Sequence, residues 1–160
     1  MKREAHKRGT RGQVLIEVLL MLPVFLLLVF SVMETGHLAF RTILLHHAAY
    51  EVARIGSLSA MAIATPGCPP PVVNSNKLKL IASSFFNNNA AAAPQVSAIP
   101  KPTLADPQEG CMNYDVEVTL VQRIPMIFPM TGLILSNTKD RRYRVLTAEV
   151  RMPIERPLFK

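Results

Sequence analysis

An apolar run at residues 14–33 limits most strongly what this chain can fold into. Twenty helical residues at about 1.5 Å each span roughly 30 Å, the thickness of the hydrocarbon core of a bilayer. Glu17 is the one charged residue in the run, and the twelve residues at the start of the chain contain five Lys or Arg and one Glu. A cationic flank marks the cytoplasmic end of a membrane helix. The run therefore predicts a single-pass transmembrane helix with a cytoplasmic N-terminus.

Glu17 needs a positive partner, because a carboxylate inside a membrane helix costs on the order of 3 kcal/mol to insert. Cleavage between Gly12 and Gln13 would supply one, since the new amine of Gln13 is charged at neutral pH. Two charges about 4 Å apart at an effective dielectric near 20 attract by roughly 4 kcal/mol, which offsets the cost of insertion. A processing site at Gly12 and Gln13 is therefore one explanation of Glu17, which would pair with this amine or with that of a neighbouring chain.

A secretory signal peptide is the nearest alternative to this membrane helix. Its apolar core would be about 7–15 residues long and would lead into small residues around a cleavage site. The run here is longer, contains Glu17 and has no such pattern in residues 31–37. We expect the segment to remain in the mature protein.

The net charge of +7 at pH 7 does not indicate a nucleic-acid-binding protein. The first twelve residues contribute +4 of this charge and the rest of the chain +3. Charge concentrated beside a membrane helix is first a signal of topology. We therefore expect no nucleic acid among the partners.

The sequence divides into a cytoplasmic leader at residues 1–12, a long helix at 13–58 and an extracytoplasmic α+β domain at 59–160. The helix carries its transmembrane segment at 14–33. Beyond this segment two sets of residues recur every seven positions: apolar Leu38, Leu45 and Val52, and small Thr35, Thr42, Ala49 and Gly56. Such a stripe packs closely, either on the sheet of the same chain or on a neighbouring subunit.

Alternating apolar and polar residues predict an antiparallel sheet packed on this helix. The inward residues of two strands would be Val116, Val118 and Leu120, and Leu146, Ala148, Val150 and Met152. Residues 133–135 are the candidate for a third strand. A short helix is expected after Asn74 or Ser75, with Leu78, Ile81, Ala82 and Phe85 on one face. Four prolines in residues 94–107 indicate an irregular loop.

Cys68 and Cys111 both follow the membrane segment and are expected in an oxidising compartment. A disulfide between them would close a loop of about 44 residues and restrict the unfolded chain by roughly 4 kcal/mol. Zinc binding is less favoured, because no CxxC or paired-histidine spacing accompanies them. A pair of free, buried thiols is the remaining alternative.

An apolar segment at residues 124–135 joins the two strands and is the candidate interaction loop. Such a segment must be buried, touch the membrane or contact another protein. If it is exposed, we expect its contact residues with other subunits to be Pro125, Ile127, Phe128, Pro129 and Leu133. A basic cluster, Lys139, Arg141, Arg142 and Arg144, follows and is expected to form a solvated turn, and only secondarily a site for acidic lipid or a partner.

Two stretches carry a resemblance to a known family. The basic leader, Gly12 before the cut and Glu17 at the fifth mature position resemble a type IV prepilin processing site. Residues 48–54, which read AAYEVAR, resemble TadE-like proteins, the minor pseudopilins of the tight-adherence (Tad, type IVb) pilus machinery. The major pilin of that system has Tyr after the glutamate, where this chain has Val18, and is much shorter. The resemblance therefore favours a minor component.

The resemblance implies a pilin-like fold and a structural or assembly role. A prepilin peptidase would cut after Gly12, and the subunit would sit in the bacterial inner membrane or the pilus, with its domain periplasmic or extracellular. Its partners would be that peptidase, other Tad pilins and pseudopilins, and the assembly platform. The alternative is an uncleaved bitopic protein whose outer domain binds or adheres.

No catalytic, cofactor or metal site is expected. The four histidines lie in the leader or along the long helix, and no serine, cysteine or carboxylate is placed by motif to act with them. His46 and His47 point to different sides of a helix, so they do not form a metal-binding pair. The sequence therefore indicates a protein that is not an enzyme.

Overall fold

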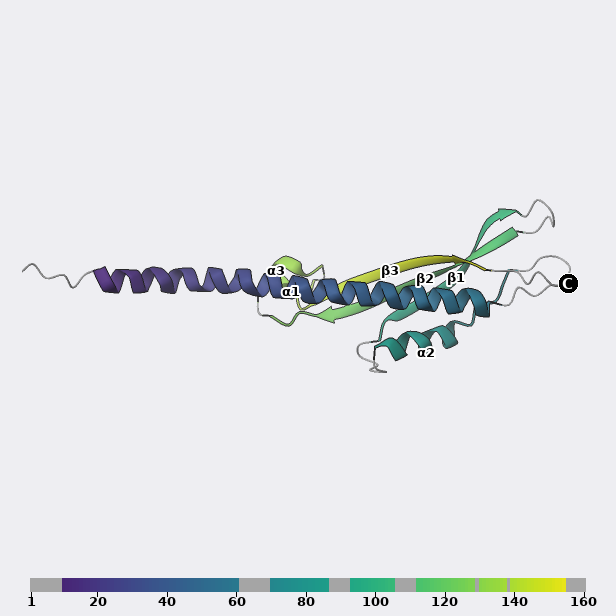
Figure 1. Ribbon diagram of the computed structural model, residues 1–160, viewed down its shortest axis with the longest axis horizontal. Helices are drawn as coiled ribbons and strands as arrows, with labels where there is room; N and C mark the ends of the chain where they lie inside the picture. Colours follow the sequence, from purple (N-terminus) through teal and green to yellow (C-terminus); the bar gives the residue numbers. More distant parts are fainter. Residues whose placement is uncertain are drawn as a thin grey trace, which may run out of the picture.

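A long helix and a small domain packed against its second half make up the fold. The computed structural model describes residues 10–60, 70–86, 93–105, 112–128, 130–137 and 139–154. Its elements are α1 (Thr10–Ser59), α2 (Ser75–Phe85), β1 (Gln95–Ala105), β2 (Met112–Pro125), α3 (Gly132–Leu135) and β3 (Tyr143–Pro153). Figure 1 shows α1 as one rod whose first half projects away from the domain. The expected α+β fold, a long N-terminal helix on a small antiparallel sheet, is confirmed.

The sheet has three antiparallel strands in the order β1-β2-β3. In the central strand the expected alternation is confirmed, because Val116, Val118 and Leu120 are fully buried. These residues pair across the strands with inward-facing residues of β3, as Leu120 does with Ala148. One face of the sheet therefore covers α1 and the other faces away from it.

The core forms where the second half of α1 meets this sheet and α2. Its fully buried members on α1 include Leu45, Ala49 and Val52, which belong to the two seven-residue sets. Gly56 lies so close to the domain that an added Cβ would be 3.4 Å from side-chain atoms of Leu78 and Val116. Of the two partners considered for the stripe, the structure therefore shows the chain's own domain.

The segment expected as an irregular loop at residues 94–107 is instead strand β1 over most of its length. Pro100 pairs with Val116, and Pro102 pairs with Tyr114. Prolines two positions apart place their nitrogens, which lack a hydrogen, on the same side of a strand. Because β1 is the edge of the sheet, that side can face outward, where no strand needs the missing donors. The prolines also block a further strand from adding to this edge.

Of the two short helices, α2 was predicted and α3 was not. Helix α2 begins as predicted, with the side chain of Asn74 accepting a hydrogen bond from the Lys77 backbone at 3.2 Å, and it buries Leu78 and Ala82. The expected strand at residues 133–135 is wrong, because these residues form the helical turn α3. The backbone nitrogens of Ile134 and Leu135 both donate to the Thr131 carbonyl. Three consecutive apolar residues carry no period that separates a strand from a turn.

Candidate functional site

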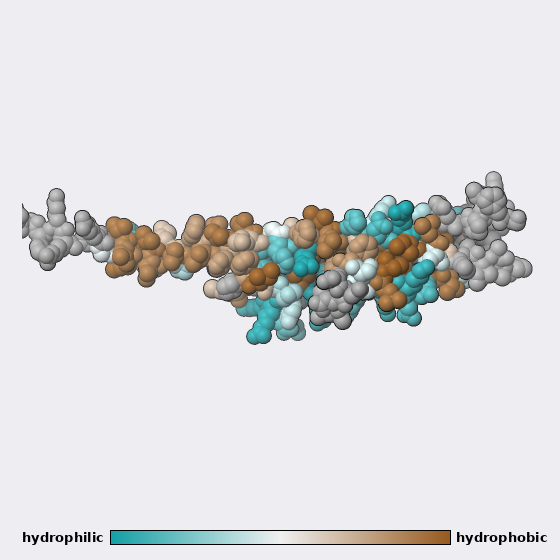
Figure 2. Space-filling view, turned by 60° about the horizontal axis from the view of Figure 1, so that its bottom comes forward, coloured by the Kyte–Doolittle hydropathy of each residue, from teal (hydrophilic) through white to brown (hydrophobic). Residues whose placement is uncertain are grey.

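The first half of α1 presents an apolar surface in which Glu17 is the one charged side chain from residue 14 to residue 33. Figure 2 shows this half as a brown rod beyond the mixed surface of the domain. Its side chains from Val14 to Phe25 are mostly more than half exposed, and none of its most apolar window is buried in the chain. By length and composition α1 is the one described helix able to cross a membrane. This surface is suited to lipid or to other apolar helices.

The proposed processing residues lie at the N-terminal end of this helix. Gly12 and Gln13 belong to the first turn of α1, which begins at Thr10. Glu17 follows one turn later, and its side chain is exposed. Among the residues that the structure describes, no side chain pairs with Glu17. The Glu17 carboxylate is therefore accessible to a positive partner, such as an amine made by cleavage or a group of another chain.

A second acid on α1, Glu34, is fully buried at the point where the bare half of the helix meets the domain. Its carboxylate Oε2 accepts hydrogen bonds from the backbone nitrogens of Ile127 at 3.1 Å and Phe128 at 3.0 Å. Thr131 Oγ1 lies 3.4 Å from the same oxygen and donates to the Phe128 carbonyl at 2.8 Å. Two backbone donors thus converge on one carboxylate oxygen, and a buried N–H that lost this acceptor would be left unsatisfied. Glu34 therefore holds the candidate interaction loop against α1.

Neighbouring contacts support the Glu34 anchor. The ring of Phe128 stacks on that of Phe30 with centroids 5.3 Å apart and planes 12° from parallel. On the other side of the carboxylate, His37 Nδ1 lies 3.8 Å from Glu34 Oε1, while His37 Nε2 accepts from Arg41 Nε at 3.4 Å. The loop is thus fixed to α1 by an apolar and a polar contact.

The loop itself is largely exposed beyond these anchors. Ile127 is 61% exposed and Leu133 is 56% exposed, Pro125 is exposed at the end of β2, and Phe128 is half-buried on Phe30. Pro129 lies outside the described residues. An open pocket of about 510 Å³ lies beside the loop, and its lining includes Met130, Leu133, Arg141 and Arg142. The structure thus brings most of the predicted interaction residues together with part of the basic cluster.

A third surface is the face of α1 turned away from the sheet. It carries four large exposed apolar side chains: Phe40, Ile43, Tyr50 and Leu58. The spacings of 3, 7 and 8 residues place them within about one third of the helix circumference. This outer face continues the apolar surface of the first half along the domain, with the exposed polar side chains of His47 and Arg54 among its apolar residues.

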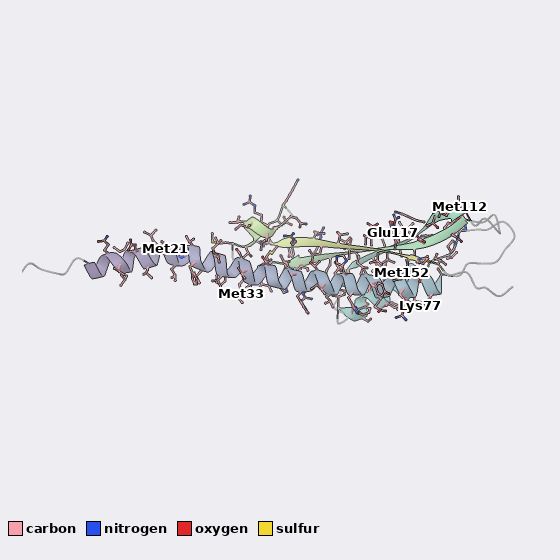
Figure 3. All side chains as sticks on the ribbon, turned by 45° about the horizontal axis from the view of Figure 1, so that its top comes forward. Met21, Met33, Lys77, Met112, Glu117 and Met152 are labelled. Carbon is pink, nitrogen blue, oxygen red and sulfur yellow. The ribbon has the colours of Figure 1, made fainter. Side chains whose placement is uncertain are left out.

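The opposite side of the sheet carries a charge cluster around Glu117. Lys101 Nζ donates to Glu117 Oε1 at 2.5 Å, and Arg151 pairs with Oε2. The hydrogen bond from Lys101 is the largest effect lowering the pKa of Glu117, and Arg151 adds to it against the opposing effect of desolvation. Figure 3 labels Glu117 on the sheet, away from the projecting half of α1. This cluster ties the three strands together.

The sequence interpretation missed Glu34 altogether. The signal available was a lone acid directly after an apolar run, but its partners lie more than ninety residues away. Cys68 and Cys111 lie outside the described residues, so their pairing stays a prediction. Among the residues described, no three His, Cys, Asp or Glu side chains gather as metal ligands.

Comparison with known proteins finds a similarity in the long helix α1. Residues 12–54 match a family model described as TadE-like protein, a match that covers α1 from its first turn almost to its end. No curated protein and no solved structure matches the chain significantly. The TadE-like family is pilus-related, structural and non-enzymatic. The match and the long apolar helix together support a membrane-anchored protein associated with the Tad system. Over residues 12–54, which build most of its long helix, this chain is similar to TadE-like proteins.

Proposed function

We propose that the protein is a minor pseudopilin, a structural and assembly subunit of the type IVb Tad pilus. In this proposal α1 crosses the bacterial inner membrane once, with residues 1–12 cytoplasmic and the domain of residues 59–160 periplasmic. Its partners are other Tad pilins and pseudopilins and the assembly platform. The observation that carries the proposal is the unpartnered apolar outer face of α1.

Exposure of this outer face to water is unfavourable, and packing against another subunit would remove that exposure. Phe40, Ile43, Tyr50 and Leu58 are each at least half exposed, although they lie beyond the residues that a bilayer covers. Large apolar side chains gathered on one exposed face mark an interaction surface. Because this face continues from the membrane segment, a neighbouring helix can lie along both halves of α1. That geometry suits a bundle of pilin helices packed side by side.

Processing by a prepilin peptidase is part of the same proposal. The bond between Gly12 and Gln13 lies in the first turn of α1, where backbone N–H groups have no partner within the helix. A terminal turn opens at little cost, so a protease can take it in an extended form. Cutting there removes the basic leader and creates the amine that Glu17 is placed to meet, in the same chain or in a neighbour.

The test of assembly places a charge on the outer face. We expect Ile43→Arg to fold and insert but to lose crosslinks to other pilins and its place in sheared pilus fractions. Leu104→Arg is the matched control, because it adds the same charge at a site that is 80% exposed on β1. Normal incorporation of the Ile43→Arg subunit would contradict the proposal.

Glu17 is tested separately. We expect Glu17→Ala to insert at least as well as the wild-type chain, because a charge is removed from the segment that spans the lipid. Processing or incorporation into the pilus should nevertheless fail, since the amine of Gln13 loses its partner. Unchanged piliation in this mutant would argue against the charge pair and favour the uncleaved bitopic protein with a binding or adhesion domain.

A further inference from the structure

We propose that residues 126–128 and 130–135, called the foot segment below, insert into the leaflet of the bilayer nearest the domain and hold the domain on the membrane. The occupant of this surface is the same lipid bilayer that α1 spans. The inference rests on the membrane span of α1 and is independent of cleavage and of pilus assembly.

The depth of the foot segment follows from its attachment to α1. Phe128 stacks on Phe30, and the backbone nitrogen of Phe128 donates to Glu34. Phe30 lies three residues before Met33, the end of the expected span, which is about 4.5 Å along the helix axis. Apolar groups at membrane interfaces are buried to roughly 5–10 Å. The foot segment is therefore fixed at the level of the lipid interface.

The side chains of the foot segment suit that level. Four large apolar residues are more than half exposed: Ile127, Met130, Leu133 and Ile134. In Figure 1 the turn α3, which carries two of them, lies beside α1 at the end of the domain nearest the bare half of the helix. Lipid chains would cover these residues without any further protein.

Cations lie next to these apolar residues. Arg141 and Arg142 are exposed and line the same pocket as Met130 and Leu133, together with Asp140. Guanidinium groups bind phosphate oxygens in a fork geometry. An apolar tip with adjacent cations is the pattern of segments that lie in the interface of an anionic membrane. Contact with other subunits, the first expectation for this loop, does not by itself explain why the loop is held at this depth.

Three properties of the foot segment thus point to the same occupant: its depth, its apolar tip and its flanking cations. Its anchoring adds a fourth, because two backbone hydrogen bonds to the buried Glu34 fix the segment before any partner arrives. A prearranged segment loses little conformational entropy when it enters the interface.

The chain contains no tryptophan, which provides a direct probe of depth. The full chain carrying Ile134→Trp or Leu133→Trp is reconstituted in vesicles of phosphatidylcholine and phosphatidylglycerol, with or without bromine on the acyl chains. We expect brominated lipid to quench both tryptophans. Leu20→Trp, in the middle of the span and 70% exposed, is the positive control. Leu104→Trp is the negative control, because Ala105 beside it pairs with Met112 at the far end of the domain, labelled in Figure 3.

The outcomes separate this inference from the membrane span itself. Quenching of Leu20→Trp without quenching at residues 133 and 134 would overturn the inference. The same result is expected if another copy of the chain, rather than lipid, covers those two tryptophans. Loss of quenching in Leu20→Trp would overturn the span on which it rests. In the Ile134→Trp chain, the double substitution R141Q/R142Q should weaken quenching more in vesicles that contain phosphatidylglycerol than in vesicles of phosphatidylcholine alone. Unchanged quenching would refute the role of the two cations.

Discussion

Replacing Glu34 is the sharpest perturbation of the junction between α1 and the domain. The Glu34→Ala chain would lose the acceptor for the backbone nitrogens of Ile127 and Phe128, at 3.1 and 3.0 Å. A backbone N–H left without its acceptor costs about 2 kcal/mol, so the two together hold the loop by roughly 4 kcal/mol. Glu34→Gln keeps the side-chain volume and one carbonyl oxygen, and we expect about half of this loss.

Hydrogen exchange of the full chain in nanodiscs measures this quantity at the residues concerned. A loss of about 4 kcal/mol in the free energy of local opening corresponds to roughly a thousandfold faster exchange at the amides of Ile127 and Phe128. The control is Glu51→Gln on the same helix. The Glu51 carboxylate lies 3.7 Å from the guanidinium of Arg54, whose side chain is exposed. An exposed pair of this kind contributes about 0.5 kcal/mol or less, so exchange in the loop should not change.

Two results would refute this reasoning. If Glu34→Ala leaves exchange at Ile127 and Phe128 at the wild-type rate, the carboxylate does not hold the loop. If all of α1 and the sheet exchange faster by the same factor, Glu34 supports the whole domain rather than the loop.

Three further predictions concern the domain. The pKa of Glu117 is lowered by Lys101 and then Arg151, so its stabilising effect is present above the unfolded pKa near 4.5 and is lost as the pH falls through the folded pKa. The free energy of unfolding of the detergent-solubilised chain should therefore fall at acid pH, and Glu117→Gln should make this fall shallower. An unchanged pH dependence would contradict this. Gly132→Ala would place a Cβ 1.8 Å from the Arg141 carbonyl oxygen, so the turn must shift and limited proteolysis between β2 and β3 should quicken; equal cleavage rates would argue otherwise. Non-reduced and reduced samples should migrate differently on a gel if Cys68 and Cys111 are bonded, whereas identical migration would indicate free thiols.

Sequence reasoning was most successful where a period extends over many residues. The helix expected at residues 13–58 is observed at Thr10–Ser59, because the apolar run and the seven-residue repeat both indicate a helix. The inward residues of β2 and β3 were likewise predicted from strict alternation. In both cases the local pattern and the burial in the folded chain agree.

The errors have physical causes that no local pattern reveals. Strand β1 was missed because prolines disfavour strands unless their missing donors face outward, and the edge position is a property of the whole sheet. The turn α3 was taken for a strand because three apolar residues fit either structure. Glu34 was missed because its hydrogen-bond donors lie in a distant loop. Long-range contacts decide each of these positions.

The central claim is that a basic head is removed so that Glu17 meets a new positive terminus. Intact-mass measurement of the protein from membranes of the native host, followed by N-terminal sequencing, tests this claim most directly. The account predicts a chain that begins at Gln13 and lacks residues 1–12. Recovery of a fully functional chain that still begins at Met1 or Lys2 would contradict it.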